Sequence, residues 1–175
     1  NAIVQNAGQT CSAGSRVLIE QPIYDALLSR LGEAFEALRV GPATMDLDLG
    51  PLIRQTQQQR VWDFLSDAQT AHIPIVAQGS VVDEAPDTGF YQAPVLLADV
   101  PVGHRIAQEE VFGPVLSAMP FTAEDHAVEL AHAPHFGLVS GVWSRAGARQ
   151  FRMPPRVKSG HVFIHNYGSA CCGEL

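Results

Sequence analysis

Apolar residues follow two different periods along the chain, and the two periods alternate. After Pro22 they recur at intervals of three and four residues, which places them on one face of a helix that ends before Gly41. Shorter, denser apolar runs lie between such stretches and predict strands, of which those at 15–20 and 73–77 are expected to be buried. The predicted helices cover residues 22–38, 55–69, 123–132 and 145–153, and the predicted strands cover residues 15–20, 73–77, 91–97, 115–121, 138–143 and 161–165.

This alternation of strands and helices predicts the fold class. Strands joined through helices need crossover connections, which favour parallel pairing with helices covering both faces of the sheet. The expected fold is therefore α/β with a mostly parallel sheet. The sequence shows no internal repeat, low-complexity tract or linker, so we expect residues 1–175 to form a single domain.

Charge and composition exclude several classes of function. The net charge of −7 would repel phosphate backbones, so non-specific nucleic-acid binding is not expected. No apolar run approaches the ~20 residues that a membrane span requires. Three cysteines are too few for a disulfide framework and favour a reducing compartment, so the expected location is cytoplasmic. The chain begins with Asn1 and has no signal-peptide pattern, which indicates either processing or a piece of something longer.

Phosphate-binding glycine loops are absent from the sequence. Neither G-x-G-x-x-G nor a P-loop pattern occurs. If a nucleotide binds, other residues or another domain must therefore hold most of it.

Candidate chemistry is concentrated at residues 6–16, where Cys11 stands among small residues between Gly8 and Gly14. Small neighbours would let a substrate approach the sulfur, and nearby backbone N–H groups could stabilise a thiolate or an oxyanion. The alternative is a buried cysteine that packs as a small apolar side chain. The residue types alone leave both interpretations open.

The order of residues around Cys11 resembles a known family. The run G-Q-T-C-S-A-G-S-R-V is similar to the nucleophile segment of the aldehyde dehydrogenase superfamily. Further segments resemble motifs of that family, in the same order and at similar spacing from about residue 6 to about residue 168. They are G-P-L-I at 50–53 with Gln57 and Arg60 behind it, G-F-Y-Q-A-P-V-L at 89–96, Q-E-E-V-F-G-P-V at 108–115, F-G-L at 136–138 and S-G-H-V at 159–162.

The resemblance implies a role for several residues. Cys11 would be the catalytic nucleophile, attacking an aldehyde to give a thiohemiacetal. Hydride would leave for NAD or NADP, and the resulting thioester would be hydrolysed. Glu110 would accept hydrogen bonds from the nicotinamide ribose, and Phe112 would pack beside the nicotinamide ring. Gln57 and Arg60 occupy positions near that ribose in some relatives.

The resemblance also implies that parts of the family's machinery are absent from these 175 residues. The family's general-base glutamate, its oxyanion asparagine and its dinucleotide-binding domain all lie upstream of the nucleophile. The chain therefore resembles a catalytic domain cut from a longer enzyme, itself expected to be a homo-oligomer. Alone it should bind cofactor poorly and turn over little or nothing. One position differs from the family pattern, because His165 stands where relatives have an asparagine and Asn166 follows it.

Several alternatives stay open at this point. An acylating, coenzyme A-dependent aldehyde dehydrogenase would share the same motifs. A cysteine-dependent amidase or hydrolase would need a histidine partner. A non-catalytic remnant could retain Cys11 and Glu110. The sequence determines neither the aldehyde nor the choice between NAD and NADP.

The remaining histidines and cysteines give no clear signal. His161 and His165 would be about 13 Å apart on one strand, too far to share a metal ion, so no metal site is expected. Cys171 and Cys172 are adjacent. A vicinal disulfide, a redox-sensing pair and two ordinary thiols are all compatible with that spacing.

Overall fold

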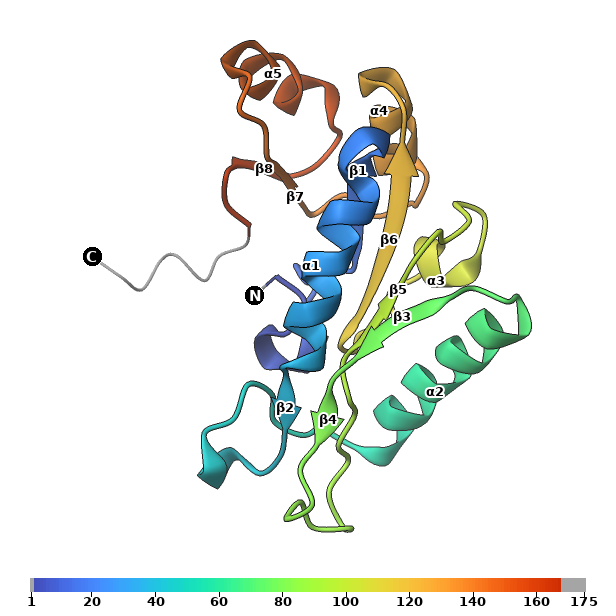
Figure 1. Ribbon diagram of the computed structural model, residues 1–175, viewed down its shortest axis with the longest axis vertical. Coiled ribbons are helices and arrows are strands. Elements are labelled where there is room, and N and C mark those ends of the chain that lie inside the picture. Colours follow the sequence, from blue (N-terminus) through green and yellow to red (C-terminus); the bar gives the residue numbers. More distant parts are fainter. Residues whose placement is uncertain (1, 168–175) are drawn as a thin grey trace.

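The computed structural model describes residues 2–167 (Figure 1). The two adjacent cysteines, Cys171 and Cys172, lie outside the described residues. Within residues 2–167, no helix combines the length and the apolar character needed to cross a membrane.

The central sheet has four strands in the order β1-β6-β5-β3. β1, β6 and β5 pair in parallel, and β3 joins the edge antiparallel to β5. Two parallel pairs, β2–β4 and β7–β8, form separate small sheets. The mostly parallel α/β fold is thus confirmed. The strands are β1 (Arg16–Glu20), β2 (Arg39–Val40), β3 (Ile75–Gln78), β4 (Ser80–Val81), β5 (Val95–Leu97), β6 (Val115–Phe121), β7 (Val139–Val142) and β8 (His161–Ile164).

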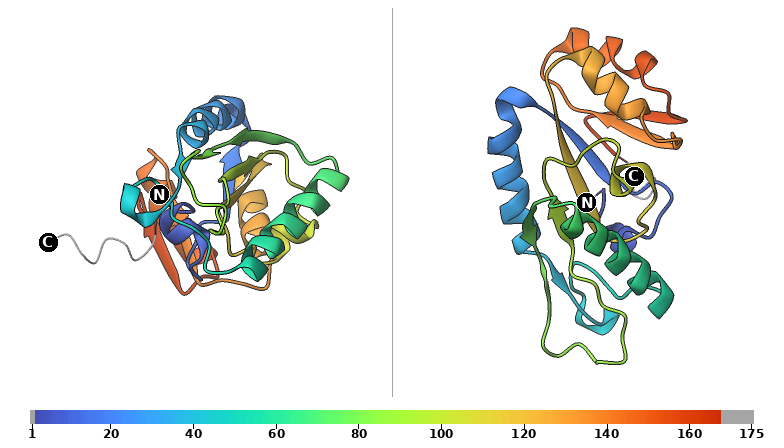
Figure 2. Two further views of the ribbon diagram at one scale, coloured as in Figure 1. Left: turned by 90° about the horizontal axis from the view of Figure 1, so that it is seen from below. Right: turned by 90° about the vertical axis from the view of Figure 1, so that its right-hand side faces the viewer.

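Helices cover both faces of the central sheet, as the alternating pattern predicts (Figure 2). One face carries α1, and the opposite face carries α2 with the short α3 and part of α4. The described helices are α1 (Tyr24–Glu36), α2 (Gln55–Thr70), α3 (Arg105–Gln108), α4 (Glu124–His132) and α5 (Gly147–Arg152), with 3-10 helices at Gln5–Gly8, Gln21–Ile23, Ala43–Met45 and Pro154–Arg156.

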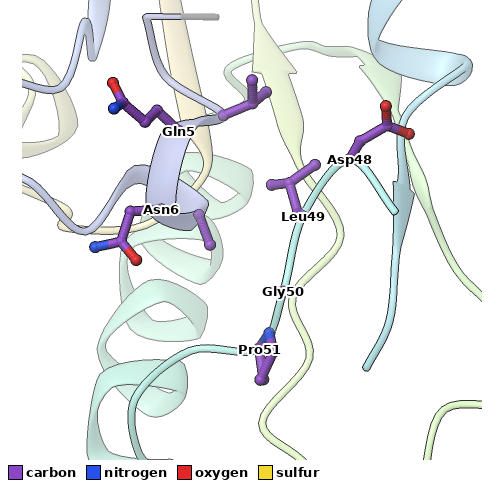
Figure 3. Close-up of a pocket in the computed structure, with 8 residues that line it drawn as sticks. Gln5, Asn6, Asp48, Leu49, Gly50 and Pro51 are labelled. Atoms are coloured by element: carbon purple, nitrogen blue, oxygen red, sulfur yellow. The ribbon is translucent and has the colours of Figure 1, made fainter. Parts of the chain in front are cut away.

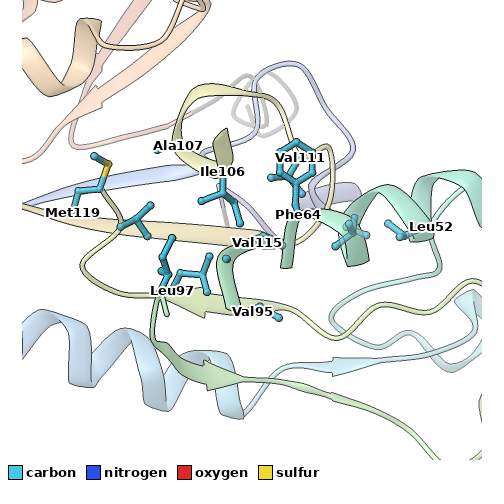
Figure 4. Close-up of a cluster of buried hydrophobic side chains, with 14 of the residues drawn as sticks. Leu52, Phe64, Val95, Leu97, Ile106, Ala107, Val111, Val115 and Met119 are labelled. Carbon is cyan, nitrogen blue, oxygen red and sulfur yellow. The ribbon is translucent and has the colours of Figure 1, made fainter. Parts of the chain in front are cut away.

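Alternation along the parallel strands creates two hydrophobic cores. In β5, Leu96 packs with Phe35 of α1, whereas Val95 and Leu97 belong to the opposite cluster around Phe64 of α2 (Figure 4). Successive side chains of a strand point to opposite faces, so a strand covered on both sides must be apolar throughout. This explains why the run at 115–121 predicts its strand so well.

Three predicted strands differ from the observed ones. The run at 15–20 is expected to be buried, but β1 begins at Arg16 and only Ile19 of its residues is buried. The run at 73–77 is expected to be buried, but β3 begins at Ile75 and only Ala77 of its residues is buried. β3 lies at the sheet edge, where one side meets solvent. The strand expected at 91–97 is reduced to β5, because Pro94 lacks the N–H that a ladder needs. The preceding segment pairs elsewhere, with the N–H of Leu52 donating to the carbonyl of Phe90 at 2.8 Å.

A network of ion pairs fastens α5 to α4 and to the end of β1. Arg149 contacts Glu124 at 2.8 Å and Glu20 at 3.0 Å, and Arg152 contacts Glu124 at 2.5 Å. Hydrogen bonds from Arg152 and Arg149 lower the pKa of Glu124 from 4.5 to about 2. The charge of Glu124 therefore stabilises the attachment of α5.

Glu124→Gln should remove a pH-dependent part of the stability. The folded pKa lies below the unfolded value, so the contribution is fully present above pH 4.5 and is lost as the pH falls toward 2. Urea unfolding of the 175-residue chain across that range should show the wild type more stable above pH 4.5 and the two proteins converging near pH 2. Glu129→Gln, an exposed residue of the same helix, is the matched control. A difference between wild type and Glu124→Gln that does not change with pH would contradict this account.

Candidate active site

Cys11 lies in an exposed turn between the 3-10 helix Gln5–Gly8 and β1. The N–H of Ala13 donates to the carbonyl of Thr10 at 3.1 Å, and the N–H of Gly14 donates to the carbonyl of Ala2 at 2.9 Å. The thiol is exposed to solvent and lies ahead of the half-buried strand β1. The alternative of a buried, packing cysteine is wrong.

The backbone before Cys11 takes an unusual path. Three successive residues, Asn6, Ala7 and Gly8, have φ values of 51°, 52° and 72°. The left-handed region costs an alanine about 1–2 kcal/mol, whereas asparagine and glycine tolerate it better. The Asn6 side chain supports the turn by donating to the carbonyl of Gln9 at 3.0 Å. This segment is held in a strained shape ahead of the thiol.

Gly8 brings this segment against the motif at 108–115. A Cβ at Gly8 would overlap the carbonyl group of Gly113, and a Cβ at Gly113 would overlap the side chain of Val61 in α2. The backbone of Gly8 thus packs on the backbone of Gly113, and Gly113 packs on the side chain of Val61. Glycines at these two positions allow segments separated by about a hundred residues in sequence to touch.

Gln9 ties the same turn to the segment at 50–53. Its side-chain oxygen accepts a hydrogen bond from the N–H of Ile53 at 2.9 Å, and its amide nitrogen donates to the carbonyl of Asn6 at 3.2 Å. Gln58 of α2 in turn donates to the carbonyl of Tyr91 at 2.7 Å. The structure therefore assembles the segments at 6–16, 50–60, 89–96 and 108–115 around one end of α2.

The segment after α3 carries Glu110 and Phe112, and α2 holds its backbone. Gln57 donates to the carbonyl of Val111 at 3.1 Å and to that of Phe112 at 2.8 Å. Arg60 donates to the carbonyl of Glu110 at 2.5 Å. Phe112 itself has a φ of 58°. Of the predicted site residues, these four thus form one contact group. Cys11 is not part of it, but Gly8, three residues before Cys11, lies against Gly113, the residue after Phe112.

Glu110 is exposed, and within residues 2–167 its carboxylate makes no hydrogen bond or ion pair. An open carboxylate of this kind is an acceptor for two neighbouring hydroxyl groups, such as those of a ribose. The Glu110 carboxylate is therefore able to accept hydrogen bonds from a diol of this kind.

Arg16, the last residue of the segment at 6–16, and Tyr167, which lies against Gly14, make contacts that sequence patterns give little indication of. Arg16 caps the end of α4 by donating to the carbonyls of Leu130 and Ala131 at 2.9 and 3.4 Å. Burial lowers the pKa of Arg16 and raises that of Tyr167. A Cβ at Gly14 would come within 3.3 Å of the Tyr167 ring. An isolated arginine inside an apolar strand is the one signal that could have indicated this arrangement.

An open pocket of about 400 Å³ lies beside the 3-10 helix Gln5–Gly8 (Figure 3). Residues Val4 to Ala7 line one side and residues Asp48 to Pro51 the other. Cys11 is not among the lining residues. Among residues 2–167 there is also no group of three or more histidine, cysteine or acidic side chains placed to hold a metal ion.

Comparison with known proteins gives a consistent set of relatives. A family model described as the aldehyde dehydrogenase family matches residues 1–171. An aldehyde dehydrogenase from Didymella fabae is 37% identical over 164 residues, which are 93% of this chain and 33% of that protein. A betaine aldehyde dehydrogenase from Rhizobium johnstonii is 32% identical over 93% of this chain and 34% of its own length.

Solved structures agree with these relatives. A crystal structure from Burkholderia cenocepacia that is assigned to the aldehyde dehydrogenases is 64% identical, with a TM-score of 0.95 over 97% of this chain and 36% of that one. An NAD⁺ complex of an aldehyde dehydrogenase from Bacillus cereus has a TM-score of 0.88 at 29% identity, over 95% of this chain and 34% of that one. The chain thus spans about a third of the length of the relatives it matches.

Proposed function

Because this chain belongs to the aldehyde dehydrogenase family, we propose that it is the nucleophile-bearing part of a longer NAD(P)-dependent enzyme that oxidises an aldehyde to a carboxylic acid. The observation that carries the proposal is the close approach of Gly8, which precedes the exposed Cys11 turn, to Gly113, the residue that directly follows the Glu110–Phe112 segment. The substrate would be a small-molecule aldehyde. The longer enzyme would be cytoplasmic and a homo-oligomer.

In this reaction Cys11 supplies the nucleophile. Its thiolate forms a bond to the aldehyde carbon, and the oxygen takes up the negative charge as a thiohemiacetal is made. The backbone N–H of Cys11 stabilises that oxygen. NAD(P)⁺, when bound, accepts the hydride that converts this species to a thioester. Water then releases the carboxylic acid and restores the thiol.

The proposed cofactor-binding residues would orient the nicotinamide end of NAD(P). The open Glu110 carboxylate would accept hydrogen bonds from the ribose hydroxyls, and Phe112 would pack beside the nicotinamide, with Gln57 and Arg60 next to them on α2. Most of the dinucleotide, and the general base for hydrolysis, would be held by parts of the longer protein. We therefore expect the 175-residue chain alone to bind NAD(P) weakly and to be inactive.

Aldehyde-dependent formation of NAD(P)H by the full-length protein tests this proposal. Over a panel of aliphatic and aromatic aldehydes, we expect one equivalent of acid for each NAD(P)H formed, without added coenzyme A. A strict requirement for coenzyme A would instead assign the acylating activity. Amide hydrolysis without NAD(P)H formation would assign a hydrolase, although Cys11 makes no hydrogen bond with a histidine in the described part of the chain.

A further inference from the structure

We propose that Gln57 and Arg60 are positioning residues, which act on the Glu110–Phe112 backbone before any cofactor binds. Gln57 and Arg60 would then influence cofactor affinity through the shape of this segment. This inference rests on the proposed function, because it concerns how Glu110 is presented to a ribose. It assigns the two α2 side chains a structural partner within the chain, where motif position alone places them beside the cofactor.

These side chains already use hydrogen-bond donors within the chain. The Gln57 amide nitrogen has two N–H groups, and it donates to two carbonyls, those of Val111 and Phe112. Only its side-chain oxygen is left for another partner. Arg60 adds the carbonyl of Glu110, so three successive carbonyls receive donors from a single helix.

A second contact, with the ring of Phe64, also fixes the position of Arg60. Its guanidinium carbon lies 4.9 Å from the ring centroid of Phe64, which is itself fully buried in the core. Such stacking favours one orientation of the guanidinium plane. Gln57, Arg60 and Phe64 are spaced at three and four residues along α2, so one face of the helix provides both the donors and their support.

The segment at 110–112 needs this support because its own backbone provides little. It lies between the end of α3 at Gln108 and the start of β6 at Val115, outside any helix or strand. Its carbonyls receive no backbone N–H among residues 2–167. Phe112 also adopts a left-handed φ of 58° that an aromatic residue disfavours. Donors from α2 therefore satisfy carbonyls that would otherwise lack a protein partner. They also hold the backbone from which the Glu110 side chain projects.

Limited proteolysis of the full-length protein without cofactor tests the inference directly. A glutamyl endopeptidase cleaves after Glu109 or Glu110 only when this segment opens. Gln57→Met keeps the length of the side chain but removes both donors. We expect cleavage at this segment to become about tenfold faster, because two hydrogen bonds no longer oppose opening. Gln59→Met is the matched control and should leave the rate unchanged, because Gln59 is exposed and, within residues 2–167, its side chain bonds only to Asp63.

Kinetics of the same variants separate positioning from general destabilisation. Gln57→Met should raise the KM for NAD(P) about tenfold and leave the KM for the aldehyde within about twofold. Arg60→Met should act in the same direction. Arg60→Lys, which keeps a donor but loses the planar group that stacks on Phe64, should raise the KM for NAD(P) less than Arg60→Met does. Because Arg60 is exposed, its variants should fold even if Gln57→Met does not.

Each outcome decides the inference. Faster cleavage together with a raised cofactor KM supports it. Unchanged cleavage with a raised cofactor KM overturns it in favour of direct contact with the cofactor. Unchanged cofactor KM overturns it whatever the cleavage rate. If neither the wild type nor any variant turns over an aldehyde, the proposed function fails. The cleavage rates still report whether α2 holds the segment at 110–112.

Discussion

Cys11→Ser should reduce aldehyde-dependent NAD(P)H formation by the full-length protein by at least about 10³-fold. Serine is nearly the same size as cysteine, but its hydroxyl is far less ionised at neutral pH than a thiol. Cys11 is exposed and makes no side-chain hydrogen bond within residues 2–167, so the substitution removes no fold-stabilising contact described there. The rate is measured from the absorbance of NAD(P)H.

Cofactor binding provides the control for that experiment. The dissociation constant for NAD(P) of the Cys11→Ser protein, from a fluorescence titration, should stay within a few-fold of the wild type, because Glu110, the proposed acceptor for the ribose, is untouched. Equal turnover by the two proteins would contradict the role of Cys11. Loss of both turnover and cofactor binding would indicate a damaged site and leave the thiol chemistry without support.

Gly8→Ala should destabilise the 175-residue chain by about 2–5 kcal/mol. The left-handed φ of 72° costs an alanine about 1–2 kcal/mol. The added Cβ would also overlap the carbonyl group of Gly113, and overpacking of this kind costs about 1–3 kcal/mol. The free energy of unfolding in urea measures the sum. In the full-length protein, the same change should disrupt the contact between the segment before Cys11 and Gly113.

Gly103→Ala is the matched control for that measurement. A Cβ at Gly103 meets no atom within 4 Å, and its φ is not in the left-handed region. Its unfolding free energy should stay within about 0.5 kcal/mol of the wild type. Equal stability of the Gly8→Ala and Gly103→Ala chains would show that the close approach of Gly8 to Gly113 does not exist in solution.

Much of the fold follows from local sequence patterns. Strand β6 and helix α2 are predicted nearly to the residue, because their apolar periods reflect burial that the whole element shares. Strand β3 shows the limit of this reasoning. Its apolar residues resemble those of a central strand, but its place at the sheet edge depends on pairing with β5, which no local pattern encodes.

The candidate site, like the fold, is predicted from sequence only in part. Sequence motifs single out Cys11 and Glu110 as candidate site residues, because the residues around them stand in a particular order. They do not indicate that Gln57 and Arg60 bond to backbone carbonyls fifty residues away. Nor do they predict a left-handed φ at Ala7 or Phe112, where residue type argues against it. Such features arise only when distant segments are brought together, and they are the ones that shape the site.

Rapid-quench mass spectrometry of the full-length protein tests the central claim most directly. The protein is mixed with aldehyde and NAD(P)⁺, acid-quenched during the first turnover and digested. We predict that the peptide containing Cys11 gains the mass of the aldehyde less two hydrogens, as a thioester requires, and that no such adduct forms without NAD(P)⁺. Formation of NAD(P)H while Cys11 stays unmodified, or an adduct on a different residue, would contradict the account.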